Sequence, residues 1–286
     1  MQSLIPVVCA VVGAWLFVAG IASCLAPSTG PAPMGTSMLF GGTLLAVAFQ
    51  LWRNRSRAAG RAAPLSPGRA TAAPQDGDWL ANLPDVDGFR RAAQALAALD
   101  AILSPEWEAR YFSFDARWSE EHQLASMRDG SGDHWFAQIG RDGIVVHGLA
   151  HECEDFVRGE PKPWVFRHLP RELGATFLAE PAFDTANSTY CLWRAANATQ
   201  WSRGPVPATA RDDGAHDQLQ LLWSGAVGYR DWAEEYYEAR LELADVEALF
   251  RHEPVTLERA RRMNPAIDFV ALQKELSAID YPAASA

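Results

Sequence analysis

The chain has 286 residues, of which 49% are hydrophobic and 21% are charged, so it has enough apolar material for at least one sizeable core. Its 25 basic and 35 acidic residues give a formal net charge of −10, but the charges are unevenly placed. None occurs before Arg53, and five arginines precede the first acidic residue, Asp76. The 20 basic and 35 acidic residues after position 75 give that part a net charge of −15. This charge disfavours nucleic-acid binding, because neutralising phosphates requires a basic face.

Two apolar segments open the chain and predict a transmembrane helical hairpin within residues 1–52. Residues 4–26 are long enough to cross a hydrocarbon core of about 30 Å at 1.5 Å per residue. Prolines and glycines follow, and a shorter apolar segment covers 37–52. Its length leaves open whether it spans the bilayer or lies at the interface. Trp52 is the expected anchor at a headgroup boundary.

A cleaved secretion signal and a lipoprotein signal are the alternatives for the first segment. Ile21-Ala22-Ser23-Cys24 resembles a lipobox, which would place a lipid on Cys24. A secretion signal, however, begins with positive charge, and the first three residues have none. A lipidated Cys24 would also leave the second apolar segment without an explanation. The hairpin is therefore the favoured interpretation.

The arginines between the membrane segments and the rest of the chain predict its orientation. Basic residues within about 15–20 residues of a membrane segment stay in the cytoplasm. Residues 53–78 are rich in Ala, Arg, Pro and Gly and predict a basic flexible linker, which would also be attracted to lipid headgroups. We therefore expect a bacterial inner-membrane protein whose acidic domain, residues 79–283, lies in the cytoplasm.

The sequence predicts an α+β fold for the acidic domain, with an antiparallel meander covered by helices. A helical stripe predicts a helix over 88–103, and an apolar–polar alternation predicts a strand over 111–118, with Phe112, Phe114, Ala116 and Trp118 on one face. Turn sequences separate further strands at 122–128, 134–140 and 144–150. The remaining expected elements are a helix at 170–180, a hairpin over 189–206 with Asn197 in its turn, a helix with an aromatic stripe from Tyr229 to Tyr237, and helices at 244–252, 256–263 and 266–279.

His147, His151 and Cys153 are of metal-ligand type. Residues four apart in a strand are separated by about 13 Å, so one ion could be shared only if the strand ended and turned near Ala150. Structural or surface histidines are the favoured interpretation, and the sequence predicts no metal site.

The glycine-rich segment from Asp129 to Asp133 places oxygen atoms at alternate positions, as a calcium loop does. The twelfth position of such a loop would be Gly140 rather than glutamate, so the EF-hand interpretation fails. We expect a hairpin turn whose aspartates bind backbone amides. Arg128 before it either pairs with one of these aspartates or presents its charge to a partner.

Nucleophilic catalysis would need a convergent nucleophile, base and orienting group. Cys153 or Cys191 with His134, His147, His151 or His168 could supply the residue types, but their spacing selects no set. The chain also has no Walker, dinucleotide or GxSxG fingerprint. The sequence therefore predicts no catalytic residue and no cofactor.

Acidic residues gather in the last third of the chain: Glu234, Glu235, Glu238, Glu242, Asp245 and Glu247. Solubility alone could explain them. They could also form a docking surface for a basic protein, which they would attract electrostatically. Our expected partner-binding residues are Arg128, Asp129, Asp133, Glu234, Glu235 and Glu238.

The chain resembles a family of uncharacterised bacterial proteins. The resemblance covers roughly residues 105–255 and follows five segments in order: LASMRDGSGDHWF from Leu124, GLAHE from Gly148, EPAF from Glu180, CLWR from Cys191 and WAEEYY from Trp232. It implies a small domain of the kind that can act as a toxin-immunity protein, a role drawn by analogy. The membrane hairpin departs from the family pattern and puts a freely diffusing role in doubt.

The sequence thus predicts a membrane-tethered cytoplasmic domain that binds a protein, in the first place an immunity protein that neutralises a bacterial toxin. The alternatives are a membrane-bound enzyme or metal-dependent hydrolase that uses the region of His147, His151 and Cys153, and an envelope-associated scaffold.

Overall fold

The computed structural model describes residues 77–153, 162–205 and 212–284. The predicted membrane hairpin and nearly all of the predicted linker lie outside these residues. Gly77 and Asp78, which the sequence assigns to the linker, already belong to the first 3-10 helix, η1 (Gly77–Asn82). No helix within the described residues is long and apolar enough to cross a bilayer.

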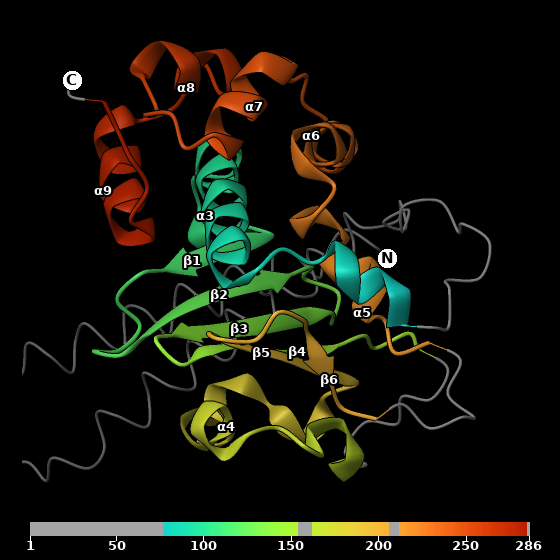
Figure 1. Cartoon of the computed structure of the whole chain (residues 1–286). Helices are drawn as coiled ribbons and strands as arrows, with labels where there is room; N and C mark the ends of the chain where they lie inside the picture. The colour runs from blue at the N-terminus through green and yellow to red at the C-terminus, as the bar shows by residue number, and fades with distance from the viewer. Residues whose placement is uncertain (1–76, 154–161, 206–211, 285–286) are drawn as a thin grey trace, which may run out of the picture. The chain divides into compact units, whose positions relative to one another are not determined.

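One antiparallel sheet runs through the described part of the domain, and its six strands follow one another in chain order (Figure 1). The strands are β1 (Phe112–Asp115), β2 (His122–Arg128), β3 (His134–Gly140), β4 (Gly143–Leu149), β5 (Tyr190–Ala195) and β6 (Ser202–Arg203). Each pairs with the next, so β1 and β6 are the edge strands. The predicted meander is confirmed.

The turn between β3 and β4 shows why the sheet needs glycine at one place. Gly143 has a φ of +140°, and a Cβ atom there would lie 2.2 Å from the carbonyl oxygen of Arg194 on β5. Only glycine tolerates both the conformation and the contact. The two-residue turn therefore places β4 tightly between β3 and β5.

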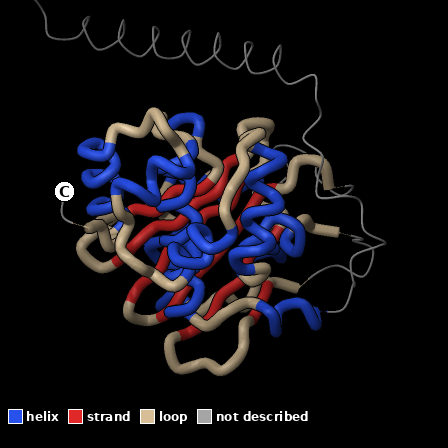
Figure 2. Tube along the Cα trace, turned by 90° about the horizontal axis from the view of Figure 1, so that it is seen from above, coloured by secondary structure: helices blue, strands red, loops and turns tan. Residues whose placement is uncertain are grey.

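Helices form a layer on each face of the sheet, seen in Figure 1 above and below the strands. The upper layer contains α3 (Val86–Leu103), α6 (Gly225–Tyr236), α7 (Leu243–Phe250), α8 (Leu257–Met263) and α9 (Phe269–Ile279), with α5 (Ala215–Leu219) and η6 (Gln220–Leu222) leading into α6. The lower layer contains α4 (Arg171–Leu178), η3 (Pro163–Phe166) and η4 (Pro181–Phe183). Two further 3-10 turns, η2 (Trp107–Ala109) and η5 (Thr185–Asn187), lead into β1 and β5. Figure 2 shows the helices of the larger layer lying across the strands.

Three of the described helices, α3, α8 and α9, begin where a polar side chain replaces a missing backbone acceptor. Asp85 accepts a hydrogen bond from Gly88 N at 2.8 Å before α3, and Thr256 accepts one from Arg259 N at 3.2 Å before α8. Asp268 accepts bonds from Val270 N and Ala271 N before α9. Such caps stabilise a helix by about 1 kcal/mol each.

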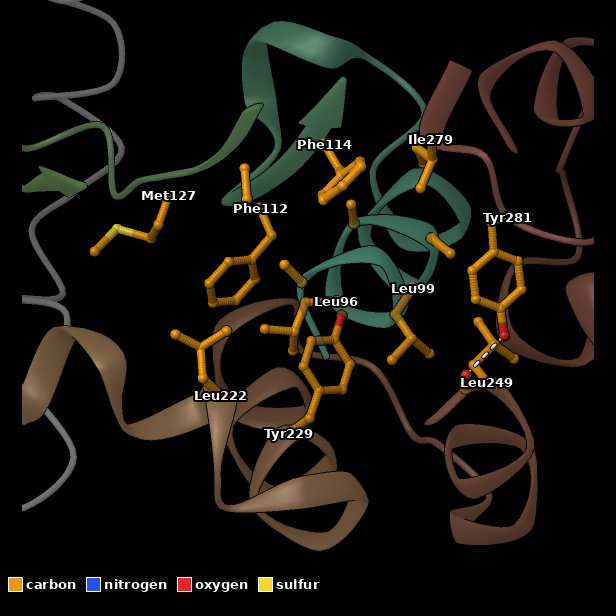
Figure 3. Packing of buried hydrophobic residues seen from close by; sticks show 14 of the residues in the cluster. Leu96, Leu99, Phe112, Phe114, Met127, Leu222, Tyr229, Leu249, Ile279 and Tyr281 are labelled. Carbon is orange, nitrogen blue, oxygen red and sulfur yellow. Dashed lines mark hydrogen bonds between the residues drawn. The ribbon is translucent and has the colours of Figure 1, made fainter. Parts of the chain in front are cut away.

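The larger core lies between α3 and the upper face of the sheet. Phe112 and Met127 from the strands meet Leu96 and Leu99 of α3, with Tyr229 of α6 beside them (Figure 3). The Tyr281 hydroxyl donates to the carbonyl oxygen of Leu249 at 2.7 Å and fastens the C-terminal segment to α7. The apolar stripe from which the helix was predicted is the face of α3 that packs in this core, because Phe89, Leu96 and Leu99 are all fully buried.

A smaller core lies on the opposite face of the sheet. Val145, Cys191 and Trp193 from β4 and β5 pack there against Phe177 of α4 and Phe183 of η4. Gln138 of β3 donates to the Thr176 hydroxyl at 2.8 Å and joins the sheet to α4. The two faces therefore have separate apolar cores.

Two predicted strands are shorter in the structure. β1 ends at Asp115, because Ala116 N bonds to Ala278 O of α9 and Asp115 caps Arg117 N in a turn. Trp118 consequently leaves the face of Phe112 and stacks on Phe183 of the smaller core, with ring centroids 6.1 Å apart. The prediction that Trp118 shares a face with Phe112 is wrong.

The second strand of the predicted 189–206 hairpin is only β6, two residues long. The other predicted elements are confirmed to within a few residues at their ends.

Candidate functional site

The turn between β2 and β3 is organised by Asp129. Its Oδ1 atom accepts hydrogen bonds from the backbone N–H groups of Ser131, Gly132 and Asp133 at 2.8–3.0 Å, and Ser131 Oγ donates to Oδ2. Gly130 and Gly132 adopt positive φ angles of 75° and 146°. The predicted amide-binding turn is confirmed, and its carboxylate serves the backbone.

Arg128 does not pair with either aspartate among the described residues; its guanidinium carbon lies 4.2 Å from the ring centroid of Trp107. Burial lowers the pKa of the guanidinium, and the nearby Glu108 carboxylate opposes that shift. Trp107 is 50% exposed, which is unusual for so large an apolar side chain. The pair forms an open cation–π contact at the surface.

The β2–β3 turn and the end of α6, two regions far apart in the sequence, meet through aromatic side chains. Tyr111 accepts a backbone bond from Arg128 N at 2.8 Å, and its ring lies 5.1 Å from that of Tyr236 and 4.7 Å from that of Trp232. Burial, together with the charges of Asp100 and Asp129, raises the pKa of Tyr236 to about 12. Tyr236 is nevertheless 38% exposed. We call the surface formed by Trp107, Tyr111, Arg128, Asp129 and Tyr236 the aromatic–acidic surface.

The expected partner-binding acids differ in how much of their charge is available. Glu234 is half-buried and accepts a hydrogen bond from Leu241 N at 2.9 Å, so it closes the loop after α6. Glu235 and Glu238 are exposed near the end of α6. Asp133 is half-buried and bound to His151.

Asp245 and Glu247, which the sequence groups with these acids, are paired internally. The Asp245 carboxylate is buried and lies 2.6 Å from Arg262 and 3.3 Å from Arg259. The hydrogen bond from Arg262 holds the pKa of Asp245 below its ordinary value. Glu247 pairs with Arg251 at 3.5 Å. The acidic stretch is thus less charged than its sequence indicates.

The histidines of the HGLAHEC segment have different partners. β4 ends at Leu149, and Cys153 N bonds to Ala150 O, so the chain does turn where a metal site would require it. His151 Nδ1, however, lies 2.6 Å from Asp133 Oδ1, and His147 points into the smaller core. No group of three or more His, Cys, Asp or Glu side chains within the described residues could hold a metal ion.

His147 is fully buried among aromatic rings. Its Nδ1 atom lies 2.7 Å from the hydroxyl of Ser188, which is also buried, while Nε2 has no partner within the described residues. The rings of Phe177 and Phe136 lie 5.2 and 5.8 Å away. Burial lowers the pKa of His147 to about 3, so the imidazole is neutral at pH 7. The Ser–His pair has a catalytic residue composition, but it is closed to a substrate.

Cys191 lies in the sheet beside His147. Its backbone is paired in register with that of His147 across β4 and β5, yet its sulfur contacts the carbonyl oxygen of Leu192, at 4.0 Å. Burial raises the pKa of the Cys191 thiol. A buried thiol of this kind is a poor nucleophile.

Asp100, in the last turn of α3, is a buried carboxylate that the sequence interpretation missed. Its Oδ1 atom accepts from the Tyr229 hydroxyl at 2.7 Å, and Oδ2 accepts from Phe112 N at 2.7 Å and the Tyr237 hydroxyl at 2.9 Å. Burial raises its pKa to about 6, although these three donors oppose the shift. The signal in the sequence was an aspartate four residues after Leu96, within the apolar stripe. The network joins α3, β1 and α6 and has a structural role.

The chain matches no family model, no curated protein and no solved structure. The family resemblance therefore stays a prediction. The geometry of the described residues is what remains to indicate function.

Proposed function

We propose that this chain is a membrane-tethered protein-binding domain, an immunity protein that neutralises a basic bacterial toxin at the cytoplasmic side of the inner membrane. The observation that carries the proposal is the aromatic–acidic surface. It brings two of the regions expected to bind a partner, the β2–β3 turn and the end of α6, to neighbouring positions on the folded domain.

The composition of this surface supports protein binding. Tryptophan, tyrosine and arginine are the residue types that dominate binding energy in protein interfaces. Trp107 and Tyr236 expose 50% and 38% of their surface, and Arg128 lies against the first of them. Exposed Glu108, Glu235 and Glu238 add negative charge to the same elements. This combination suits a partner with basic side chains, which could contact both rings and carboxylates.

The domain's net charge gives the proposal its second support. An excess of 15 acidic residues after position 75 would attract a basic protein and speed its association. The apolar segments and the arginines before Asp76 support tethering at the membrane, where a delivered toxin enters the cell. The resemblance to a family of possible immunity proteins points in the same direction.

Co-expression tests the proposal. The full chain is produced together with the toxin encoded beside its gene, and growth is compared with cells that receive the toxin alone. We expect the chain to restore growth and to co-purify with the toxin from detergent-solubilised membranes. A Trp107→Ala/Tyr236→Ala variant should lose at least tenfold in affinity, while Val227→Ala, at an exposed site on α6, should not.

Failure of every toxin encoded at the locus to bind, with growth unchanged by the full chain, would overturn the proposal. Equal affinity of the wild-type chain and the double variant would show that the aromatic–acidic surface is not the interface.

Reporter fusions test the proposed membrane orientation. Green fluorescent protein fused to the C-terminus should fluoresce in the membrane fraction, and alkaline phosphatase at the same position should be inactive, because the enzyme needs export to fold. An active phosphatase fusion would place the domain on the other side.

A further inference from the structure

A small pocket lies at the outer edge of β1, where this strand meets η2, α3 and α9. Its volume is about 170 Å³, and Trp107, Arg110, Phe114, Asp115 and Glu275 are among the residues that line it. Pockets for small molecules and cofactors usually measure about 300–1,000 Å³. The size suits one inserted side chain better than a free ligand.

The chemistry of the pocket selects the kind of side chain. Ala97, Ala278 and Ile279 provide an apolar lining, and Trp107 adds an aromatic ring that is half exposed. An apolar lining beside an aromatic ring suits the long methylene stem of an arginine or lysine.

The charges that line the pocket favour a cation over an anion. Arg110 is 4% exposed and has three acceptors: Glu275 at 2.7 Å, Pro105 O at 2.7 Å and Ser104 O at 2.9 Å. Its guanidinium is therefore already bound by acceptors of this chain and is not available to a ligand. Glu275 contacts Arg110 through Oε2 and is 43% exposed, and Asp115 is exposed at the end of β1. Counting Arg110, Asp115 and Glu275, the pocket has a net charge of −1.

The edge of β1 next to the pocket is largely closed by the neighbouring helices. Tyr111 O accepts from Arg128 N, so alternation along the ladder turns the N–H and C=O groups of Phe114 away from β2. The flanking outward amides are already bound, Phe112 N to Asp100 and Ala116 N to Ala278 O. Phe114 itself is only 5% exposed, so β1 offers no open run of backbone groups to an incoming strand, and recognition falls to the side-chain pocket.

We propose that an extended basic segment of the protein partner docks over this pocket and inserts one arginine or lysine side chain into it beside Trp107 and Glu275. This inference rests on the proposed function, since it names the part of the partner that the domain recognises. Trp107 belongs both to the pocket lining and to the aromatic–acidic surface, so one partner can cover the two together.

Short extended peptides provide the probe. Each is a run of alternating Ser and Thr with a single central residue, which is Arg, Lys, Gln or Glu, and binding to the detergent-solubilised full chain is followed by fluorescence anisotropy. We expect the Arg or Lys peptide to bind at least tenfold more tightly than the Gln peptide, and the Glu peptide to bind most weakly.

Variants of the chain assign this preference to the pocket. Trp107→Ala and Glu275→Gln should each weaken binding of the cationic peptide at least fivefold. Leu257→Ala removes another exposed apolar side chain, and Glu258→Gln removes another ion-paired carboxylate, so both should bind like the wild type. Thermal unfolding of every variant is measured alongside, and Asp115→Asn replaces Glu275→Gln if the latter unfolds.

Equal binding of the Arg and Gln peptides, or equal binding by the wild type and both pocket variants, would overturn the inference. So would a pocket variant that changes only the self-association of the chain in sedimentation, because a second copy would then be the occupant. If Trp107→Ala and Tyr236→Ala abolish toxin neutralisation but Glu275→Gln retains it, the pocket idea fails and the proposed function stands. If the peptides bind as expected but no toxin is neutralised, the pocket idea stands and the proposed function fails.

Discussion

The two faces of the sheet are stabilised in different ways. The face under α3, α6, α7, α8 and α9 has the larger apolar core, and the buried carboxylate of Asp100 in that layer has three donors. The face under α4 has a smaller core, and two histidines there, His134 and His147, each have a buried Nε2 atom without a partner in the described part of the chain. An unsatisfied buried polar group costs about 1–3 kcal/mol.

This contrast indicates that the larger layer supplies most of the stability and that the α4 layer is the more sensitive to pH. Ionisable groups occupy the interior of both layers, and their pKa values move in opposite directions, each of which favours the neutral form. Asp100 keeps its proton to a higher pH, and His147 releases its proton at a lower pH than usual. Each shift reflects the cost of placing a charge in a buried site.

Truncation of one phenylalanine in each layer should have the largest effect and tests the contrast most simply. Phe89 of α3 and Phe177 of α4 are both fully buried. Phe89→Ala should lower the free energy of unfolding by about 4 kcal/mol, within the range for buried aromatics. Phe177→Ala should cost less, because α4 is a short helix that can settle into the vacated space. Urea denaturation measures both, with the exposed Val270→Ala as a control near zero. A larger loss for Phe177→Ala would reverse the proposed ranking.

Removal of the His147 imidazole should make stability less dependent on pH. The folded-state pKa of about 3 lies below the ordinary value of 6.5, so this group's contribution is complete above pH 6.5 and is lost as the pH falls towards 3. Between pH 7.5 and 4.5 the wild type should lose ~2 kcal/mol more than His147→Phe does. Phenylalanine suits the aromatic surroundings, and His134 titrates in both proteins. Denaturation at the two pH values makes the comparison, and parallel losses would contradict the role given to His147.

Substitution of Asp100 should give the opposite pH trend. Its pKa of about 6 exceeds the ordinary value of 3.8, so its favourable contribution is greatest below pH 3.8 and is lost as the pH rises to about 6. Asp100→Asn should cost ~2 kcal/mol at pH 7.5, because an amide group would replace an acceptor of the Phe112 or Tyr donors. The cost should be larger at pH 4.5, where the wild type regains stability. A cost that shrinks on acidification would be incompatible with this assignment.

The smallest expected effect concerns single hydroxyl groups. Tyr237→Phe removes one of three donors to Asp100 and should cost about 1 kcal/mol. Ser188→Ala removes the hydroxyl that is hydrogen-bonded to His147 Nδ1. It should cost a similar amount or more, since a second imidazole nitrogen would then lack a hydrogen bond. Thermal unfolding of the two variants at pH 7.5 compares them. A clearly greater loss for Tyr237→Phe would show that the Asp100 network depends on every donor.

Much of the sheet could be predicted from sequence because its signals are local. Phe112 and Phe114 alternate with polar residues, and the Asp129–Asp133 segment has the glycines and aspartates that a tight turn requires. The end of β1 could not be predicted in this way. It depends on a hydrogen bond between Ala116 N and Ala278 O. These two residues are far apart in the sequence, so the local periodicity around β1 does not predict the bond.

The candidate site was predictable only in part, for the same reason. The sequence selected the β2–β3 turn and the end of α6 separately, and the contact between Tyr111 and Tyr236 that joins them became visible in the fold. Trp107 was missed because an exposed tryptophan looks like a buried one in sequence. Asp245 was misjudged as part of a charged surface because its partners, Arg259 and Arg262, lie on the next helix.

The affinity of the detergent-solubilised full chain for the toxin encoded at its locus tests the central claim most directly. Titration calorimetry of the wild type, Trp107→Ala and Leu257→Ala gives the comparison at one salt concentration. We expect tight binding by the wild type and by Leu257→Ala, and at least tenfold weaker binding by Trp107→Ala. No binding by the folded wild-type chain, or the same affinity for all three proteins, would contradict the account.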